Sequence, residues 1–175
     1  MDYAPSVRFC EVLLNDEYQG VYLLTEKIKR DINRVNIDKL EPAEIAGDDL
    51  TGGYILKIDK NAGAENAGWS SSYPPNNDAW QETVFFYHYP KPEDIVPEQE
   101  SYIQNFMHDF EQSLKSSNFD DPLSGYRNFI DVTSFIDFMF INEIGRNVDG
   151  YRLSTYMHKN KDSEGGKLKM GPVWD

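Results

Sequence analysis

The chain has 175 residues, with thirty Asp and Glu against seventeen Lys and Arg and a formal net charge of −13. This length suits one domain with a buried core, and a hydrophobic content of 39% is typical of a globular protein rather than a disordered one. The negative field repels nucleic acid and anionic membranes, which argues against a general polyanion-binding role. No apolar run approaches the roughly 20 residues of a transmembrane helix, so we expect no membrane-spanning segment.

The first half of the sequence has the pattern of β-structure. Two apolar runs, 9–14 and 20–25, predict a hairpin closed by a loop at 15–19. The turn Thr51-Gly52-Gly53 leads into another strand-like run. The strands expected after the hairpin are 35–37 (a short edge strand), 54–59 and 83–89.

The second half has the pattern of helices. Apolar residues recur at spacings of 3, 4 and 7 over 99–114 and again over 132–144, with Asp131 or Thr133 as an N-cap and Gly145 at the end. A loop or short strand, a turn at Gly165-Gly166 and a last strand over 167–170 then predict a terminal β-hairpin. The expected class is α+β in one domain, with a β-rich part over 1–98 and a helical part over 99–175.

Two segments near the end of the chain carry the best candidates for chemistry. Asp149 and Asp175 each stand at a junction of loop and strand, where a fixed backbone can hold a carboxylate in a cleft. A Mg²⁺–phosphate site needs such oxygen ligands. Protein kinases place an Asp five residues before a metal-binding Asn, and here Ser154 is the fifth residue after Asp149. The spacing is equally compatible with an ordinary Asp-Gly turn.

Four segments in order resemble one family. The stretches 12–26, 51–57, 147–151 and 171–175 are similar to the signatures of the CotH family, the spore-coat-protein-H-like kinases and their bacterial relatives. The resemblance spans nearly the whole chain.

The resemblance implies an atypical protein-kinase-like fold that binds ATP and Mg²⁺ and phosphorylates Ser or Thr on a protein. Asp149 resembles the catalytic aspartate and Asp175 the metal-binding one, with Ser154 where many members have a metal-binding asparagine. We assign Lys57 to the nucleotide phosphates, although an exposed strand lysine is the alternative. Glu26 is assigned to the nucleotide pocket, although it could simply end a strand.

The resemblance also suggests a parent protein that is secreted or lies in the cell envelope, although no export signal is visible. The family's upstream Arg-Gly and Lys-Lys segments are not in this sequence, and the last motif stops at Asp175. We therefore expect this stretch alone to hold an incomplete active site. The competing hypothesis is a non-catalytic surface or assembly module on a degenerate kinase scaffold, which binds a protein or a glycan through the aromatic loop Trp69–Trp80.

Overall fold

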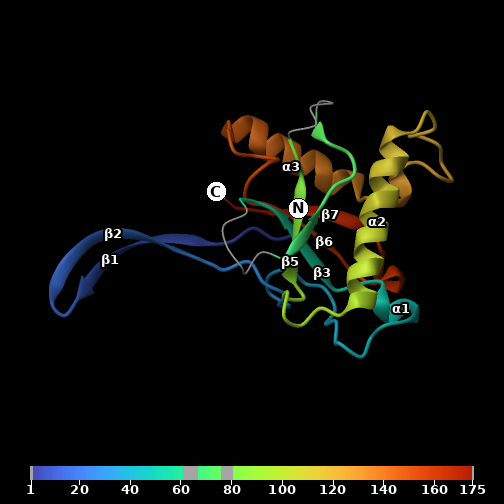
Figure 1. Cartoon of the computed structure of the whole chain (residues 1–175). Coiled ribbons are helices and arrows are strands. Elements are labelled where there is room, and N and C mark those ends of the chain that lie inside the picture. The colour runs from blue at the N-terminus through green and yellow to red at the C-terminus, as the bar shows by residue number, and fades with distance from the viewer. Residues whose placement is uncertain (1, 61–66, 76–80, 175) are drawn as a thin grey trace.

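The computed structural model describes residues 2–60, 67–75 and 81–174 (Figure 1). Its two sheets are both antiparallel, which confirms the α+β class, while the kinase-like fold stays a prediction. No helix in these ranges is both long and apolar enough to cross a membrane. The elements are β1 (Val7–Leu14), β2 (Glu17–Thr25), α1 (Gly47–Leu50), β3 (Tyr54–Ile58), β4 (Gly68–Ser70), β5 (Val84–Tyr89), α2 (Pro97–Lys115), η2 (Tyr126–Asn128), α3 (Val132–Gly145), β6 (Thr155–Lys159), η3 (Asp162–Glu164) and β7 (Leu168–Val173).

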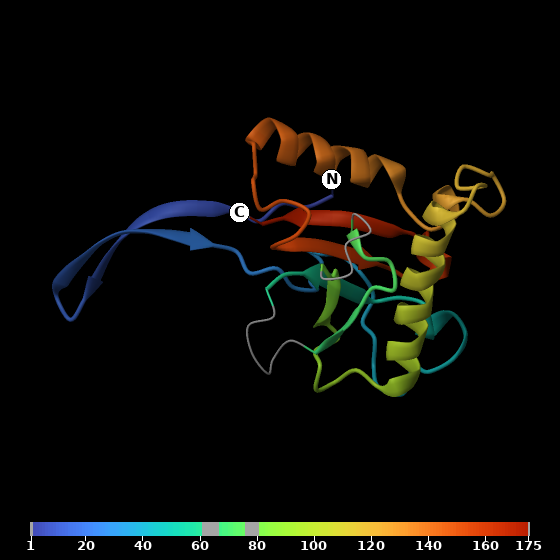
Figure 2. The same ribbon diagram turned by 45° about the horizontal axis from the view of Figure 1, so that its top comes forward.

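Strands β1 and β2 form a hairpin that projects from the body of the molecule (Figures 1 and 2). Its turn consists of Asn15 and Asp16, both with positive φ, which is the pattern of a tight two-residue connection. The longer loop expected at 15–19 is therefore wrong, because strand pairing resumes at Glu17. Large apolar side chains of both strands are exposed, including Phe9 at 83%.

The larger sheet has the strand order β4-β5-β3-β6-β7, and one face of it carries the main core. Helix α2 buries Ile103, Met107 and Phe110 against this face, as its apolar spacing predicted. Helix α3 runs alongside β7 (Figure 2). The carboxylate of Asp131 caps α3 by accepting a hydrogen bond from the Ser134 N–H.

Residues 26–38, which follow the hairpin, cross the opposite face of this sheet, and we call them the crossing segment. Ile28, Val35 and Ile37 are buried there against Ile55 of β3 and Tyr156 of β6. The short edge strand expected at 35–37 does not form, and Val35 makes only an isolated bridge to Arg30. The apolar residues of this segment pack onto the sheet face and do not pair with a strand edge.

The turn Thr51-Gly52-Gly53 is a packing site for the connection between β6 and β7. A Cβ on Gly52 would lie 1.9 Å from the backbone nitrogen of Lys161, so only glycine fits. The wholly buried Lys159 donates from Nζ to the Thr51 carbonyl at 2.5 Å and to the Asp162 carboxylate at 2.8 Å. The turn thus fixes β3 against the terminal hairpin.

Candidate functional site

The strand register brings the two predicted catalytic segments to one end of the sheet. Thr155, the first residue of β6, pairs with Ile58 at the end of β3 and with Val173 at the end of β7. The loop 147–154, which contains Asp149, therefore ends beside the end of β7. Asp175 itself lies outside the described residues, and its assignment as a metal ligand stays a prediction.

A chain of side-chain contacts ties the Asp149 loop to the end of α3. The buried Asn142 donates from Nδ2 to the Phe138 carbonyl at 2.9 Å and accepts from Asn147 Nδ2 at 3.0 Å. Asn147 in turn accepts a hydrogen bond from the Asp149 N–H at 3.1 Å. A Cβ on Gly150 would lie 2.5 Å from Asn142 Oδ1, so a glycine is required for this close approach. The backbone of Asp149 is thereby held in place.

The rest of the loop has an unfavourable backbone conformation at two residues and contains the basic residue Arg152. Tyr151 and Ser154 have φ of 72° and 48°, which non-glycine residues rarely adopt and which recur at functional sites. The Tyr151 hydroxyl donates to the Glu143 carboxylate at 3.1 Å and so holds one strained residue to α3. Between these residues, Arg152 pairs with the Asp149 carboxylate at 2.9 Å. Asp149 stays about half exposed at 47%, so an incoming hydroxyl could reach it.

Lys57 lies on β3 directly across from Tyr156 of β6. Its ammonium group lies 3.8 Å from the Asp59 carboxylate and 5.9 Å from the centre of the Phe86 ring, and its side chain is only 17% exposed. The alternative of an exposed strand lysine is therefore wrong. The structure places Lys57 at the wall of a hollow of about 540 Å³ on the face that the segment 26–38 crosses.

Glu26 directly follows β2 and caps the start of the hairpin. Its carboxylate accepts the Ser6 N–H at 2.8 Å and the Tyr3 hydroxyl at 3.2 Å, and Arg34 Nε lies 4.0 Å away. The Ser6 hydrogen bond lowers the pKa of Glu26, with smaller contributions from Tyr3 and Arg34, so the group stays ionised. Glu26 thus follows the end of a strand, and its partners Tyr3 and Arg34 line a second hollow.

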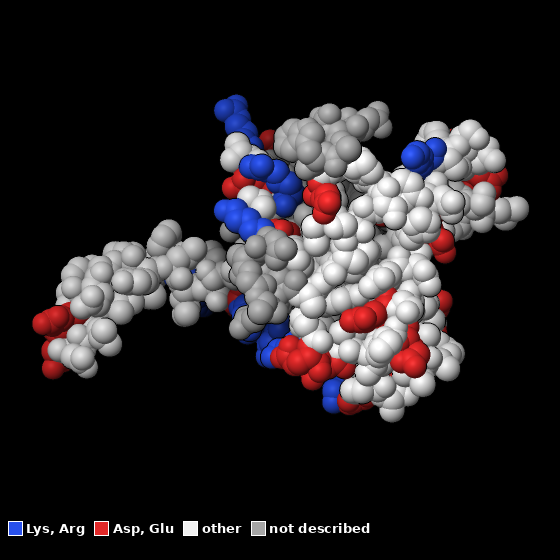
Figure 3. Space-filling view, viewed as in Figure 1, with Lys and Arg blue, Asp and Glu red and all other residues white. Residues whose placement is uncertain are grey.

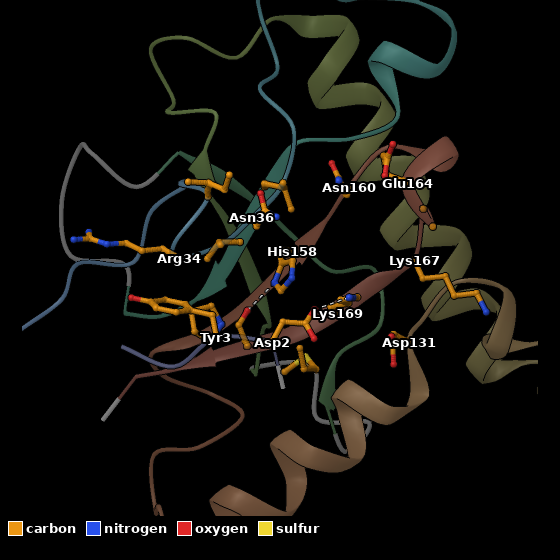
Figure 4. Close-up of a pocket in the computed structure, with 18 of the residues that line it drawn as sticks. Asp2, Tyr3, Arg34, Asn36, Asp131, His158, Asn160, Glu164, Lys167 and Lys169 are labelled. Carbon is orange, nitrogen blue, oxygen red and sulfur yellow. Dashed lines mark hydrogen bonds and ion pairs between the residues drawn. The ribbon is translucent and has the colours of Figure 1, made fainter. Parts of the chain in front are cut away.

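This second hollow has a volume of about 720 Å³ and lies on the β6–β7 side of the crossing segment. In Figure 4 the lining residues Tyr3, Arg34 and His158 come from the N-terminal residues, the crossing segment and β6, and the Arg34 side chain extends away from His158. His158 shares a hydrogen bond from Nδ1 with the Gly171 carbonyl at 3.1 Å, and Lys169 pairs with Asp2 at 2.6 Å. Lys57 and the two partners of Glu26, Tyr3 and Arg34, therefore line different hollows.

The side chains assigned to the metal are oxygen donors, the kind of ligand that a Mg²⁺–nucleotide site uses. Among the described residues no group of three or more His, Cys, Asp or Glu could hold a metal. Mg²⁺ does not require such a group, since it keeps several waters and takes one or two carboxylates together with substrate phosphates. Of the two residues assigned to the metal, Ser154 supplies a hydroxyl on the tethered loop, and the carboxylate of Asp175 lies outside the described residues.

Sequence reasoning missed Asn142, Asn147 and Arg152, although one signal was available. Ser134, Phe138 and Asn142 are the buried residues of α3, each four positions from the next. A polar residue on such a stripe must hydrogen-bond inside the fold, which identifies Asn142 as a fixing point.

The aromatic loop gives the glycan hypothesis less support than its composition suggested. Trp69 is half-buried and packs on Phe85 and Tyr87, with ring centres 5.4 and 5.3 Å apart. It therefore contributes to the core and is not a free stacking platform. Trp80 lies outside the described residues.

Comparison with known proteins gives one finding. The family model described as CotH kinase protein matches residues 2–175. No curated protein and no solved structure matches the chain. A match over this span covers the hairpin, the sheet and the Asp149 loop together, and it agrees with the motif order in the sequence. The chain therefore belongs to the CotH kinase family.

Proposed function

We propose that the protein containing this chain transfers the γ-phosphate of ATP to a Ser or Thr hydroxyl of a secreted or envelope protein. The observation that supports the proposal most is the tethering of Asp149: its backbone is fixed through Asn147 and Asn142, while its carboxylate stays accessible. A rigid mount with an exposed carboxylate is what the positioning of an acceptor hydroxyl demands.

In this proposal Asp149 orients the acceptor hydroxyl and takes its proton as the oxygen attacks the γ-phosphorus and the bond to the leaving ADP breaks. Bound Mg²⁺ would neutralise the charge that develops on the phosphates. Asp175 and Ser154 are the residues we assign to hold it. Lys57 is assigned to the nucleotide phosphates and Glu26 to the wall of the nucleotide site, each with the ionic partners described above.

The test is phosphorylation of a Ser/Thr protein substrate, with ATP and Mg²⁺, by the protein that contains this chain. Asp149→Asn keeps the shape of the residue and removes the base, so we expect the rate to fall about a hundredfold or more. Asp109→Asn, at an exposed position of α2, is the matched control and should leave the rate unchanged. An Asp149→Asn variant as active as the unaltered protein would remove the role given to Asp149.

A second candidate function is a non-catalytic module that binds a protein or a glycan. The Arg152–Asp149 ion pair favours it, because a carboxylate already engaged by a guanidinium is less available as a base. Calorimetric titration with ATP separates the two functions. A kinase binds ATP more tightly when Mg²⁺ is present, whereas a module without nucleotide chemistry gives no Mg²⁺-dependent heat.

A further inference from the structure

The smaller hollow gathers an unusual share of the positive charge of the molecule. Its walls come from the crossing segment, from β3, from β5 and from the turn after β5. Five of the seventeen basic residues of this acidic chain line it: Lys27, Lys29, Arg30, Lys57 and Lys91. The acidic residue in the described lining is Glu93. We call this site the basic hollow.

Most of these cations are weakly neutralised. Lys29 and Lys91 lie 3.5 Å from the carboxylates of Asp31 and Glu93, with both partners partly exposed to water. Such pairs contribute little, because water screens them. Within the described part of the chain, Lys27 and Arg30 make no ion pair, and the Arg30 guanidinium lies 5.7 Å from the centre of the Tyr89 ring.

The pKa of His88 reflects the positive charges around the basic hollow. Its Nε2 lies 3.0 Å from the Ile28 carbonyl, where the crossing segment meets β5. Burial lowers the pKa of His88, and the charges of Lys57 and Lys27 lower it further. Both cations therefore act on the same buried group. An anion in the basic hollow would relieve this repulsion, since opposite charges within a few ångströms attract strongly where water is partly excluded.

In Figure 3 the blue side chains of the visible face gather mainly on the side of the body from which the hairpin projects. The rest of that face carries scattered acids. A ligand with negative charge spread along its length would be repelled by the net charge of −13. A ligand with its charge concentrated in one group would suit a local cluster of cations.

The geometry points to a phosphoryl group on a peptide: we propose that the basic hollow binds a phosphoserine or phosphothreonine of a substrate that has already been phosphorylated near its next acceptor hydroxyl. This inference rests on the proposed function. Lys57 faces Tyr156 across the β3–β6 pair, and Ser154 is two residues from Tyr156. The register therefore places Lys57, in the wall of the basic hollow, across the strand pair from β6, which starts directly after the Asp149 loop. The cations Lys27, Arg30 and Lys91 remain for the peptide when Lys57 serves the nucleotide.

A phosphoryl group fits this site better than a carboxylate for two reasons. It carries nearly two negative charges and three acceptor oxygens at neutral pH, so it can accept from several lysines at once. The volume of about 540 Å³ also exceeds the needs of a bare ion, and Tyr89 and Pro92 offer apolar walls for the flanking peptide.

The experiment measures fluorescence anisotropy of three labelled peptides that differ at one position, with phosphoserine, serine or aspartate. No nucleotide is added, so the result does not depend on catalysis. We expect the phosphoserine peptide to bind at least about tenfold tighter than the other two, as charge-assisted hydrogen bonds from two or more lysines imply. Equal binding of the phosphoserine and aspartate peptides would overturn the proposal.

Variants locate the binding. Lys27→Ala/Arg30→Ala should weaken binding of the phosphoserine peptide about tenfold or more. Lys115→Ala/Arg127→Ala removes the same residue types outside the basic hollow and should not weaken it. If the first variant fails to fold, Lys91→Glu replaces it, because the Lys91 side chain is 65% exposed and reversal of its charge leaves the core intact. Unchanged affinity in these hollow variants would refute the site.

Competitors identify the source of the phosphate. Inorganic phosphate at millimolar concentration should displace the peptide only weakly, and displacement as effective as that by unlabelled phosphopeptide would overturn the assignment to a peptide. If ATP without Mg²⁺ competes fully, the basic hollow belongs to the nucleotide and the proposal fails. Binding of the phosphopeptide to an inactive Asp149→Asn protein would support the site. It would leave the catalytic role proposed for Asp149 unaffected.

Discussion

Asn142→Ala removes the side chain that ties the Asp149 loop to α3. Two hydrogen bonds are lost, from Nδ2 to the Phe138 carbonyl and from Asn147 to Oδ1, and each contributes about 1 kcal/mol to stability. Alanine has a higher helix propensity than asparagine, which adds about 0.5 kcal/mol to the free energy of unfolding. We therefore expect the free energy of unfolding to fall by about 1.5 kcal/mol, as measured by urea denaturation followed by circular dichroism.

The matched control is Asn105→Ala, which makes the same replacement at an exposed position of α2. It should gain about 0.5 kcal/mol from helix propensity alone, so the two variants should differ by about 2 kcal/mol. Asn142→Ala should also slow phosphorylation more than it reduces the folded fraction, because Asn147 no longer fixes the Asp149 N–H. Two variants of equal stability would refute the tether.

Three further predictions concern the fold. Gly52→Ala should lower the free energy of unfolding by about 3 kcal/mol, since its Cβ would overlap the Lys161 backbone; a thermal melt within a few degrees of the unaltered protein would contradict this. Lys159→Met keeps the buried volume but leaves the Thr51 carbonyl without its donor, so a loss of about 2 kcal/mol is expected in urea, and a gain in stability would contradict that expectation. Burial lowers the pKa values of His88 and His158, so the unfolded chain binds more protons below about pH 6.5, and stability should fall there by up to about 1.4 kcal/mol per pH unit for each histidine. Urea midpoints that are flat from pH 7 to 5.5 would exclude this linkage.

Local patterns predicted the two long helices, α2 and α3, and most strands, because these elements depend on residues close in sequence. The apolar spacing located α2 and α3 to within two residues at each end, and Asp131 was one of two named N-caps for α3. The hairpin turn was harder to place. Glu17 and Tyr18 are compatible with a loop, and only pairing with β1 draws them into β2.

The crossing segment was predicted wrongly for a related reason. The alternation at 35–37 indicates that Val35 and Ile37 point to one side. A β-strand and an extended segment packed on a sheet face both have this pattern. The choice between the two depends on whether a strand edge or a sheet face is nearby. Here the apolar side chains meet Ile55 and Tyr156 on the face of the sheet. Tyr156 lies more than a hundred positions after Val35 in the sequence, so no local sequence window contains this information.

The candidate site combines both kinds of information. The spacing of Asp149 and Ser154 is local and visible in the sequence, but it is equally typical of an ordinary turn. What distinguishes the two interpretations is how the loop is held. An ordinary turn needs no buried asparagine. Positive φ in such a turn is usual for Asn, Asp or Gly, as at Asn15 and Asp16 of the hairpin, but not for residues such as Tyr151 and Ser154. The unfavourable backbone is kept because Asn142 and Glu143 of α3 hold the loop from one side and β6 starts directly after it. The cost of that strain is compatible with a loop that must present one carboxylate at a fixed place, and this is why the family's Asp-Gly motif carries more weight in the folded chain than in the sequence alone.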